Sequence, residues 1–373
     1  MSAVPALAVD ASAGPAIQVL VVDDSLVIRG LIARMLKDAP GIEVAATVSD
    51  GAKAVDRVAK GGIDVVVLDI EMPVMDGLTA LPKLLAIDRN LVVIMASTLT
   101  TRNAEISITA LNLGASDYVP KPTSTSEINN AQSFREELIG KVRALGARRR
   151  GRRATATKFG AAVAKPQPAA VGLRAPSATR PHILAVGSST GGPKALSEFL
   201  VALPKSFPLP VVITQHMPPT FTRILAGSLA RDTGRSVVEA VDGDIVAPGT
   251  ILIAPGDFHM RTVRTVGGEL RVKLDTGEKE NFCRPSVDPM LRSLVDVYGG
   301  RVLLAMLTGM GRDGFKGAEV VVAAGGTVVA QDETSSVVWG MPGAVAQGGL
   351  CSCIAAPADL ARAVAALAEG HVP

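Results

Sequence analysis

Four charged residues in the first third of the chain are placed where they could bind a divalent cation and a phosphoryl group. Asp23 and Asp24 follow one apolar run, Asp69 closes a second, and Lys121 follows a third. Because the carboxyl ends of parallel strands meet at one edge of a sheet, we expect these side chains to converge. Three carboxylates suit a hard cation such as Mg²⁺, and an ammonium group suits phosphoryl oxygens.

A separate candidate for chemistry lies in the second half of the chain, where a serine stands in a glycine-rich turn. Ser189 is at the centre of Gly187–Gly192, between the apolar run His182–Val186 and Pro193, a residue typical of the first position of a helix. The pattern Gly-x-Ser-x-Gly between strand and helix is typical of a nucleophile elbow. The same turn could instead hold a phosphate group, and the motif alone does not choose between them.

A histidine and an aspartate elsewhere in this half strengthen the catalytic interpretation. His216 follows the apolar strand Pro210–Thr214, and Asp313 follows the apolar strand Val302–Leu307. Histidine can take the proton of a serine hydroxyl, and an aspartate can orient the imidazole. The chain order serine, histidine, aspartate differs from that of the α/β-hydrolases, which disfavours that family.

The elements that position these residues alternate between strands and helices. We expect strands at 19–22, 43–48, 65–68, 91–95 and 118–119 in the first half, separated by helical patterns. Such alternation predicts a doubly wound parallel sheet. The predicted fold class is α/β, with two doubly wound parallel-sheet domains, flavodoxin-like and Rossmann-like, joined by a flexible linker.

Most of the basic charge belongs to one segment. Leu138–Arg180 holds eleven Lys and Arg residues and no Asp or Glu, so subtracting these eleven from the formal +3 leaves about −8 elsewhere. From Gly146 to Arg180 the segment is rich in Ala, Pro, Gly and Thr, which is typical of disorder. Contact with nucleic acid, an anionic membrane surface or an acidic partner is one interpretation, but a solvated hinge is favoured. We predict a disordered start (1–16), a first domain (17–140), a linker (141–181) and a second domain (182–373).

Composition restricts the class of protein. The 373 residues, 48% of them apolar, are enough for two domains with cores. The first basic residue is Arg29, so a signal peptide is not expected, and no apolar run approaches the ~18 residues that span a bilayer. Three cysteines fit a reducing cytosol, which predicts a cytoplasmic protein. Cys351 and Cys353 lack partner ligands for a metal, and we interpret them as strand residues.

Residues 17–140 resemble the receiver domain of two-component response regulators. The resemblance depends on Asp23-Asp24, Asp69, Ser97 and Tyr118-Val-Pro-Lys121, which occur in order at strand ends. It implies that Asp69 accepts a phosphoryl group from a histidine kinase, with Mg²⁺ held by Asp23, Asp24 and Asp69. It further implies that Lys121 pairs with the phosphoryl group, that Ser97 hydrogen-bonds it and that Tyr118 changes rotamer. The modification adds about −1.5 to −2 charges.

The second half resembles the catalytic domain of the chemotaxis protein-glutamate methylesterases. The resemblance is carried by five segments: 187–192, 215–219, 254–260, 284–288 and 307–314. It implies that Ser189 attacks glutamyl methyl esters of chemoreceptors, with His216 as general base and Asp313 as its orienting partner. It also implies an oxyanion donor in the backbone N–H of Met310, a second activity on glutamine and no cofactor for the hydrolase.

Some assignments remain open. Ser188 stands where the family more often has alanine, so either serine could react, but the central place of Ser189 favours it. Thr190, His259 and Arg284 are candidates for lining the substrate site. We hypothesise that the unphosphorylated receiver covers the Ser189 cleft.

The expected partners are chemoreceptors and a histidine kinase. We do not expect the protein to bind nucleic acid. We expect it to act at receptor arrays without spanning the membrane. The alternative is a response regulator whose output domain binds a ligand or nucleic acid without catalysis.

Overall fold

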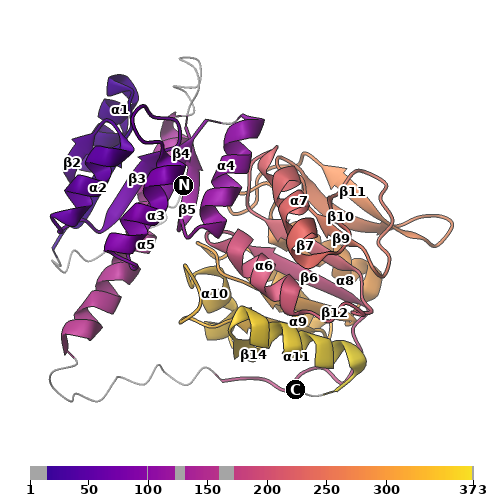
Figure 1. The fold of residues 1–373 in the computed structure, drawn as a ribbon. Coiled ribbons are helices and arrows are strands. Elements are labelled where there is room, and N and C mark those ends of the chain that lie inside the picture. Colours follow the sequence, from indigo (N-terminus) through magenta and orange to yellow (C-terminus); the bar gives the residue numbers. More distant parts are fainter. Residues whose placement is uncertain (1–14, 99, 122–130, 159–171, 372–373) are drawn as a thin grey trace, which may run out of the picture.

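The structure is a computed structural model that describes residues 15–98, 100–121, 131–158 and 172–371. Two α/β domains lie side by side, the first formed by the described residues between 15 and 158 and the second by residues 172–371 (Figure 1). This arrangement confirms the predicted fold class. No helix in the described part of the chain has the length and apolar character needed to cross a bilayer.

The first domain has a five-stranded parallel sheet in the order β2-β1-β3-β4-β5, which is the flavodoxin-like order. Its strands are β1 (Ile17–Val22), β2 (Ile42–Val48), β3 (Val65–Asp69), β4 (Val92–Ser97) and β5 (Asp117–Pro120). Its helices are α1 (Leu26–Lys37), α2 (Gly51–Ala59), α3 (Gly77–Ile87), α4 (Thr101–Asn112) and α5 (Ala131–Lys158).

Sequence chemistry accounts for these elements. The residues of β3 and β4 are buried throughout, as expected for apolar strands covered by helices on both faces. Helices α1 to α4 each begin after a side-chain oxygen that accepts a backbone N–H bond, provided by Ser25, Asp50, Asp76 and Thr100. The strand order reverses between β1 and β3, which places a crevice at their carboxyl ends.

The second domain has a seven-stranded parallel sheet in the order β14-β13-β12-β6-β7-β9-β8. Its strands are β6 (Ile183–Ser188), β7 (Val211–Gln215), β8 (Val237–Glu239), β9 (Ile251–Ile253), β12 (Val302–Met306), β13 (Thr327–Gln331) and β14 (Cys351–Ala355). A separate antiparallel hairpin is formed by β10 (His259–Arg264) and β11 (Leu270–Asp275). The helices are α6 (Gly192–Ala202), α7 (Phe221–Thr233), α8 (Val287–Tyr298), α9 (Phe315–Ala323), α10 (Met341–Gln347) and α11 (Pro357–Glu369).

The first part of the predicted linker is helical, because α5 continues past residue 140, the predicted end of the first domain, to Lys158. Arg149 is only 6% exposed and donates hydrogen bonds to the Ile63 carbonyl (2.8 Å) and to Asp88 (2.7 Å). Arg150 pairs with Asp64 at 3.1 Å. Arginines that suggested a solvated hinge therefore pair with carboxylates of the first domain and hold α5 against it. Linker residues 159–171, like residues 1–14, lie outside the described part.

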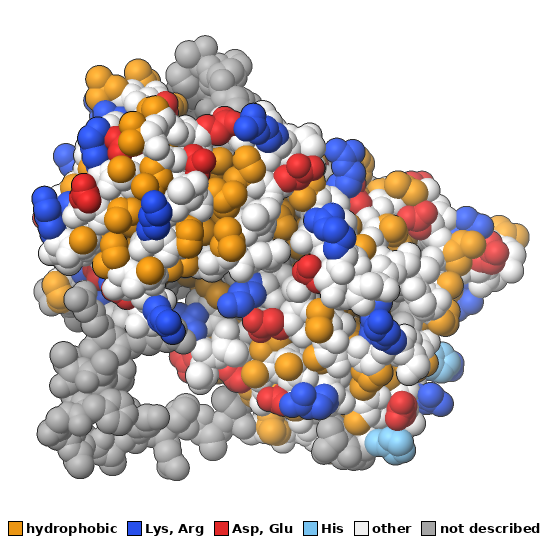
Figure 2. All heavy atoms as spheres, viewed as in Figure 1, with side chains coloured by type: hydrophobic (Ala, Val, Ile, Leu, Met, Phe, Trp, Pro, Cys, Tyr) orange, Lys and Arg blue, Asp and Glu red, His pale blue; other side chains and the backbone are white. Residues whose placement is uncertain are grey.

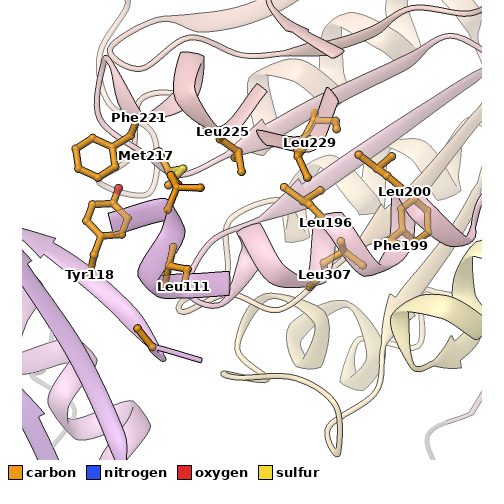
Figure 3. Close-up of a cluster of buried hydrophobic side chains, with 14 of the residues drawn as sticks. Leu111, Tyr118, Leu196, Phe199, Leu200, Met217, Phe221, Leu225, Leu229 and Leu307 are labelled. Atoms are coloured by element: carbon orange, nitrogen blue, oxygen red, sulfur yellow. The ribbon is translucent and has the colours of Figure 1, made fainter. Parts of the chain in front are cut away.

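The two domains meet through apolar side chains. Helix α4 packs on α6 and α7, and one hydrophobic cluster continues across the boundary. Within it, the Tyr118 ring of β5 stacks on Phe221 of α7, with centroids 4.5 Å apart and an interplanar angle of 10° (Figure 3). In the space-filling view the domains join into one surface, on which basic and acidic side chains are interspersed (Figure 2).

Candidate active site and phosphorylation site

The carboxylates of the first domain converge at the crevice between β1 and β3. The Nζ atom of Lys121 lies 2.5 Å from Asp23 Oδ2 and 2.6 Å from Asp69 Oδ1. Carboxylate oxygens of Asp23, Asp24 and Asp69 lie within 4.8 Å of one another. The structure thus brings together all four residues that strand-end reasoning selected.

The donor set of this pocket fits a magnesium ion, since it consists of carboxylate oxygens and Mg²⁺ prefers hard oxygen ligands. Burial raises the pKa of the Asp69 carboxyl, an effect that the Lys121 ammonium partly opposes. A cation beside Asp69 would favour the ionised carboxylate further. Asp24 is exposed, whereas Asp23 and Asp69 are buried, so the pocket is open on the Asp24 side.

The position of Asp69 is set by a close approach of the backbone. A Cβ atom at Gly77, the first residue of α3, would lie 2.0 Å from the Asp69 carbonyl oxygen. Only glycine allows α3 to begin this near the end of β3. The Asp69 Oδ1 atom also accepts the N–H of Ile70 at 2.7 Å. The carboxylate is therefore held in place before any ligand arrives.

Ser97 and Tyr118, two of the three predicted switch residues, are buried on the neighbouring strands β4 and β5. The buried hydroxyl of Ser97 is 3.1 Å from that of Ser107, which itself donates to the Asn103 carbonyl, so Ser97 is the donor of the pair. Tyr118 is buried between Phe221 and Lys141, whose Nζ atom lies 5.0 Å from the ring centroid. Tyr118 is therefore placed to link the receiver core to the second domain.

In the second domain, Ser189 lies in the turn between β6 and α6. Gly191 caps α6 with a φ of 74°, and a Cβ atom at Gly192 would lie 1.9 Å from Gln215 Oε1. Both positions therefore require glycine. The Ser189 N–H donates to the Thr308 carbonyl at 3.0 Å. The strand, tight turn and helix expected of a nucleophile elbow are all present.

The histidine and the aspartate are in direct contact. His216 Nε2 lies 2.7 Å from Asp313 Oδ2. His216 also donates its backbone N–H to Ser188, and a Cβ atom at Gly309 would lie 2.9 Å from Ser189 Cβ. The three residues thus gather at the ends of the neighbouring strands β6, β7 and β12. Among the hydrogen bonds of the described residues, none joins the Ser189 hydroxyl to the imidazole.

Asp313 is held by an unusually complete set of donors and is only 2% exposed. Besides the imidazole, the carboxylate accepts hydrogen bonds from the Ser286 hydroxyl (2.7 Å), the Asn281 amide (2.8 Å), and the N–H groups of Val287 (2.6 Å) and Gly314 (2.9 Å). Burial alone would raise its pKa, but the bond from His216 and these donors bring the pKa below its ordinary value. Asp313 is therefore an ionised carboxylate of fixed orientation.

The imidazole has a second neighbour that sequence reasoning did not select. Cys283 Sγ lies 3.4 Å from His216 Nδ1, the ring nitrogen that Asp313 leaves available. Burial would lower the pKa of His216, but the Cys283 sulfur and the Asp313 carboxylate outweigh it and raise the pKa. Since Nε2 is engaged by Asp313, Nδ1 is the nitrogen that can serve Ser189.

Gln215 is another missed residue, and it joins the serine turn to the histidine. Its side-chain amide donates to the carbonyls of Ser189 (2.9 Å) and His216 (3.2 Å), and its Oε1 accepts the Ser188 hydroxyl at 2.6 Å. Ser188 is buried and engaged, whereas Ser189 is only half-buried. This difference favours Ser189 as the nucleophile. The available signal was the position of Gln215 directly before His216.

The remaining predicted residues lie around the same site. Met310 follows β12, and no hydrogen bond of the described residues uses its backbone N–H. Thr190 is buried in the turn, and its carbonyl accepts the Thr308 hydroxyl. His259 bonds backbone groups of Glu278 and Ser286, and Arg284 donates to the carbonyls of Thr276 and Gly277. The side-chain hydrogen bonds of His259 and Arg284 therefore go to the backbone, and a role toward substrate stays a prediction.

Comparisons with known proteins agree with the division of the chain into two domains. The CheB methylesterase family matches residues 184–364, and the response regulator receiver domain family matches residues 19–132. A protein-glutamate methylesterase/protein-glutamine glutaminase of Azospirillum brasilense is 52% identical over 358 residues, covering 92% of this chain and 91% of the relative. The chain belongs to the protein-glutamate methylesterase/protein-glutamine glutaminase family. The resemblance inferred from motifs is confirmed.

Other members of the methylesterase/glutaminase family are as similar. The protein-glutamate methylesterase/protein-glutamine glutaminase of group 2 operon from Bradyrhizobium diazoefficiens is 51% identical over 364 residues, covering 92% of this chain and 91% of the relative. Among solved structures, the Thermotoga maritima CheB methylesterase catalytic domain is 41% identical and covers 51% of this chain and all of that one, with a TM-score of 0.49.

Proposed function

We propose that this protein is a phosphorylation-regulated serine esterase that demethylates glutamyl methyl esters of chemotaxis receptors and deamidates glutamines in them. The observation that carries the proposal is the 2.7 Å contact between His216 and Asp313 beside the Ser189 turn. The relatives are named for both activities. Esters and amides share an acyl carbon, so one nucleophile and one base serve both reactions.

The chemistry follows from the roles of the three side chains. The Ser189 oxygen attacks the ester carbonyl carbon, and His216 accepts the hydroxyl proton through Nδ1. The Met310 N–H then donates to the tetrahedral oxyanion, a contribution of about 3 kcal/mol for such a donor. Collapse breaks the carbon–oxygen bond of the ester or the carbon–nitrogen bond of the amide. His216 gives its proton to the leaving group, which departs as methanol from the ester or as ammonia from glutamine. Water then cleaves the acyl-enzyme by the reverse proton transfers and leaves a glutamate.

Control by the first domain is supported by the contacts at the boundary. A Cβ atom at Gly140 in α5 would lie 3.2 Å from the Met310 side chain, so α5 lies against the loop that carries the oxyanion donor. Arg148 of the same helix donates to the Thr334 carbonyl in the second domain. The unphosphorylated receiver therefore restricts access to the site for a large substrate.

Phosphorylation of Asp69 would weaken this contact. Asp23, Asp24 and Asp69 would hold Mg²⁺, whose positive charge would offset the repulsion between the Asp69 carboxylate and the incoming phosphoryl group. Lys121 would move its contact from Asp69 to the phosphoryl oxygens, and Ser97 would donate to them. Tyr118 transmits the change because its ring stacks on Phe221. Changing the ratio of open to closed molecules from 1:99 to 99:1 requires a free-energy difference of about 5.5 kcal/mol, and smaller differences give partial activation.

The alternative, an output domain that binds nucleic acid or a ligand without catalysis, is less well supported. Arg149 and Arg150, which suggested a nucleic-acid contact, pair with Asp88 and Asp64 inside the first domain. The face drawn in Figure 2 has no single basic patch among the described residues. A ligand site would not need an ionised Asp313 beside His216. We propose a cytoplasmic enzyme whose partners are chemoreceptors and a histidine kinase.

Methanol release from methylated receptor membranes tests the proposal. Wild-type protein is expected to release methanol faster after a small-molecule phosphodonor and Mg²⁺ are added. Ser189→Ala should abolish release, and Asp69→Ala should lose the stimulation. Wild-type protein that releases no methanol, with or without phosphodonor, would overturn the assignment.

A further inference from the structure

A strained turn lies beside the catalytic residues. Asn281 and Phe282 both have positive φ angles, 52° and 64°. Glu280 and Cys283 are joined by two backbone hydrogen bonds of 3.2 and 2.9 Å, so the pair occupies the centre of a tight hairpin turn. Turns with two consecutive positive φ angles favour glycine and asparagine, and phenylalanine there is disfavoured. Such strain persists where the surroundings enforce it, often at functional sites.

The residues on either side of Phe282 contact the catalytic machinery. The Asn281 amide donates to Asp313 at 2.8 Å and to the buried Asp288 at 2.9 Å. Cys283 Sγ lies 3.4 Å from the Nδ1 atom of His216. Both neighbours of Phe282 are therefore fixed by the groups that activate Ser189, and the backbone of Phe282 keeps a defined place relative to them.

Phe282 itself is presented to solvent. Its exposure is 96% with the receiver domain packed against the second domain, so the receiver does not cover it. A second phenylalanine lies on the adjoining loop: Asp257, with a φ of 64°, donates its N–H to the Arg284 carbonyl, and Phe258 is 38% exposed. Two loops with strained backbones, linked by a hydrogen bond, thus carry exposed aromatic rings at the rim of the site.

We propose that Phe282, flanked by Phe258, is a substrate-recognition residue that contacts apolar side chains next to the esterified glutamate in the receptor polypeptide. The inference rests on the proposed function and names how that site selects its substrate. A polypeptide that delivers an ester to Ser189 must pass close to the neighbours of His216 and Asp313. An exposed aromatic ring there gains contact area with little loss of conformational freedom.

The test compares two substrates of the full-length protein, methylated receptor membranes and the small ester p-nitrophenyl acetate. Phe282→Ala should raise KM for receptors about tenfold, as expected for losing part of a buried aromatic contact, while kcat/KM for the small ester is retained. Phe282→Gly should behave alike, because glycine accepts the positive φ and keeps the turn intact. Phe282→Trp keeps an aromatic ring at this position and should have the receptor KM of the wild type. Val266→Ala, at an exposed apolar position of the β10–β11 hairpin, is the matched control and should leave it unchanged.

The possible failures are distinguishable. An unchanged receptor KM in both Phe282→Ala and Phe282→Gly overturns the recognition role and leaves the proposed function standing. An equal loss with both substrates also overturns it, since the turn would then act only by positioning His216 and Asp313. Wild-type protein that cleaves the small ester but not the receptor ester overturns the proposed function together with this inference.

Discussion

The two sites use the same feature of parallel sheets but differ in how complete they are. In the receiver pocket, Lys121 already bridges Asp23 and Asp69 at 2.5 and 2.6 Å. In the hydrolase, His216 Nε2 contacts Asp313 and Nδ1 contacts Cys283, and no hydrogen bond of the described residues joins the imidazole to the Ser189 hydroxyl. The predicted residues of the first site are thus joined to one another, whereas in the second the predicted base contacts the aspartate and a cysteine. A regulated enzyme can keep its sensor ready while its hydrolase is restrained.

The largest expected effect separates the two neighbouring serines. Ser189→Ala should lower the hydrolysis of a small ester by at least ~10³-fold, because no nucleophile remains. Ser188→Ala is the matched control and should stay within about tenfold of wild type, since its hydroxyl bonds only Gln215 among the described residues. Steady-state kinetics on purified full-length protein measures both. The reverse ranking would move the nucleophile to Ser188.

A wedge in the domain boundary would test whether the receiver restrains the hydrolase. Gly140→Leu places a side chain where even a Cβ atom would lie 3.2 Å from Met310, so the domains should separate. The unphosphorylated rate on receptor membranes is expected to rise several-fold, in proportion to the population opened.

The control for the wedge is Gly30→Leu, the same substitution on another receiver helix, where nothing lies within 4 Å. It should not change the rate. A Gly140→Leu enzyme that is no faster than this control would show that contact at α5 does not limit access.

The amide of Asn281 is expected to matter for stability as well as for catalysis. Asn281→Ala removes the donor that lies between the Asp288 and Asp313 carboxylates, so both lose a hydrogen bond while buried. The free energy of unfolding should fall by about 1–3 kcal/mol. Urea denaturation measures this change, and Asn90→Ala, at an exposed position, is the control. Equal stability of the two variants would contradict the role of the amide.

The smallest expected effect concerns the contact between Cys283 and His216. A base must be neutral, so esterase activity rises as pH passes the pKa of His216; Cys283 raises that pKa and moves the rise to higher pH. Cys283→Ala should move the rise to lower pH, because the sulfur that helps to raise the His216 pKa is removed. A pH profile of kcat/KM with p-nitrophenyl acetate measures it, with Cys353→Ala on β14 as control. A rise in kcat/KM that moves to higher pH in Cys283→Ala would show that Cys283 lowers the pKa of His216.

Much of both sites was predictable because strand-end chemistry is local. Asp69 and Ser189 follow apolar runs whose length and composition specify strands, and the parallel arrangement then brings their side chains to one edge. The motifs around His216 and Asp313 are also contiguous. Cys283 and Asn281 could not be selected in the same way, because their contacts come from a turn whose backbone conformation no local pattern indicates.

The sequence by itself determined the two α/β domains, the four residues of the receiver pocket and the three of the hydrolase, since each follows from a periodicity or a short motif. Tertiary structure alone decided the length of α5, the stacking of Tyr118 on Phe221 and the contact between Cys283 and His216. These features join segments far apart in the chain. They depend on packing and charge pairing between surfaces, which local composition does not encode.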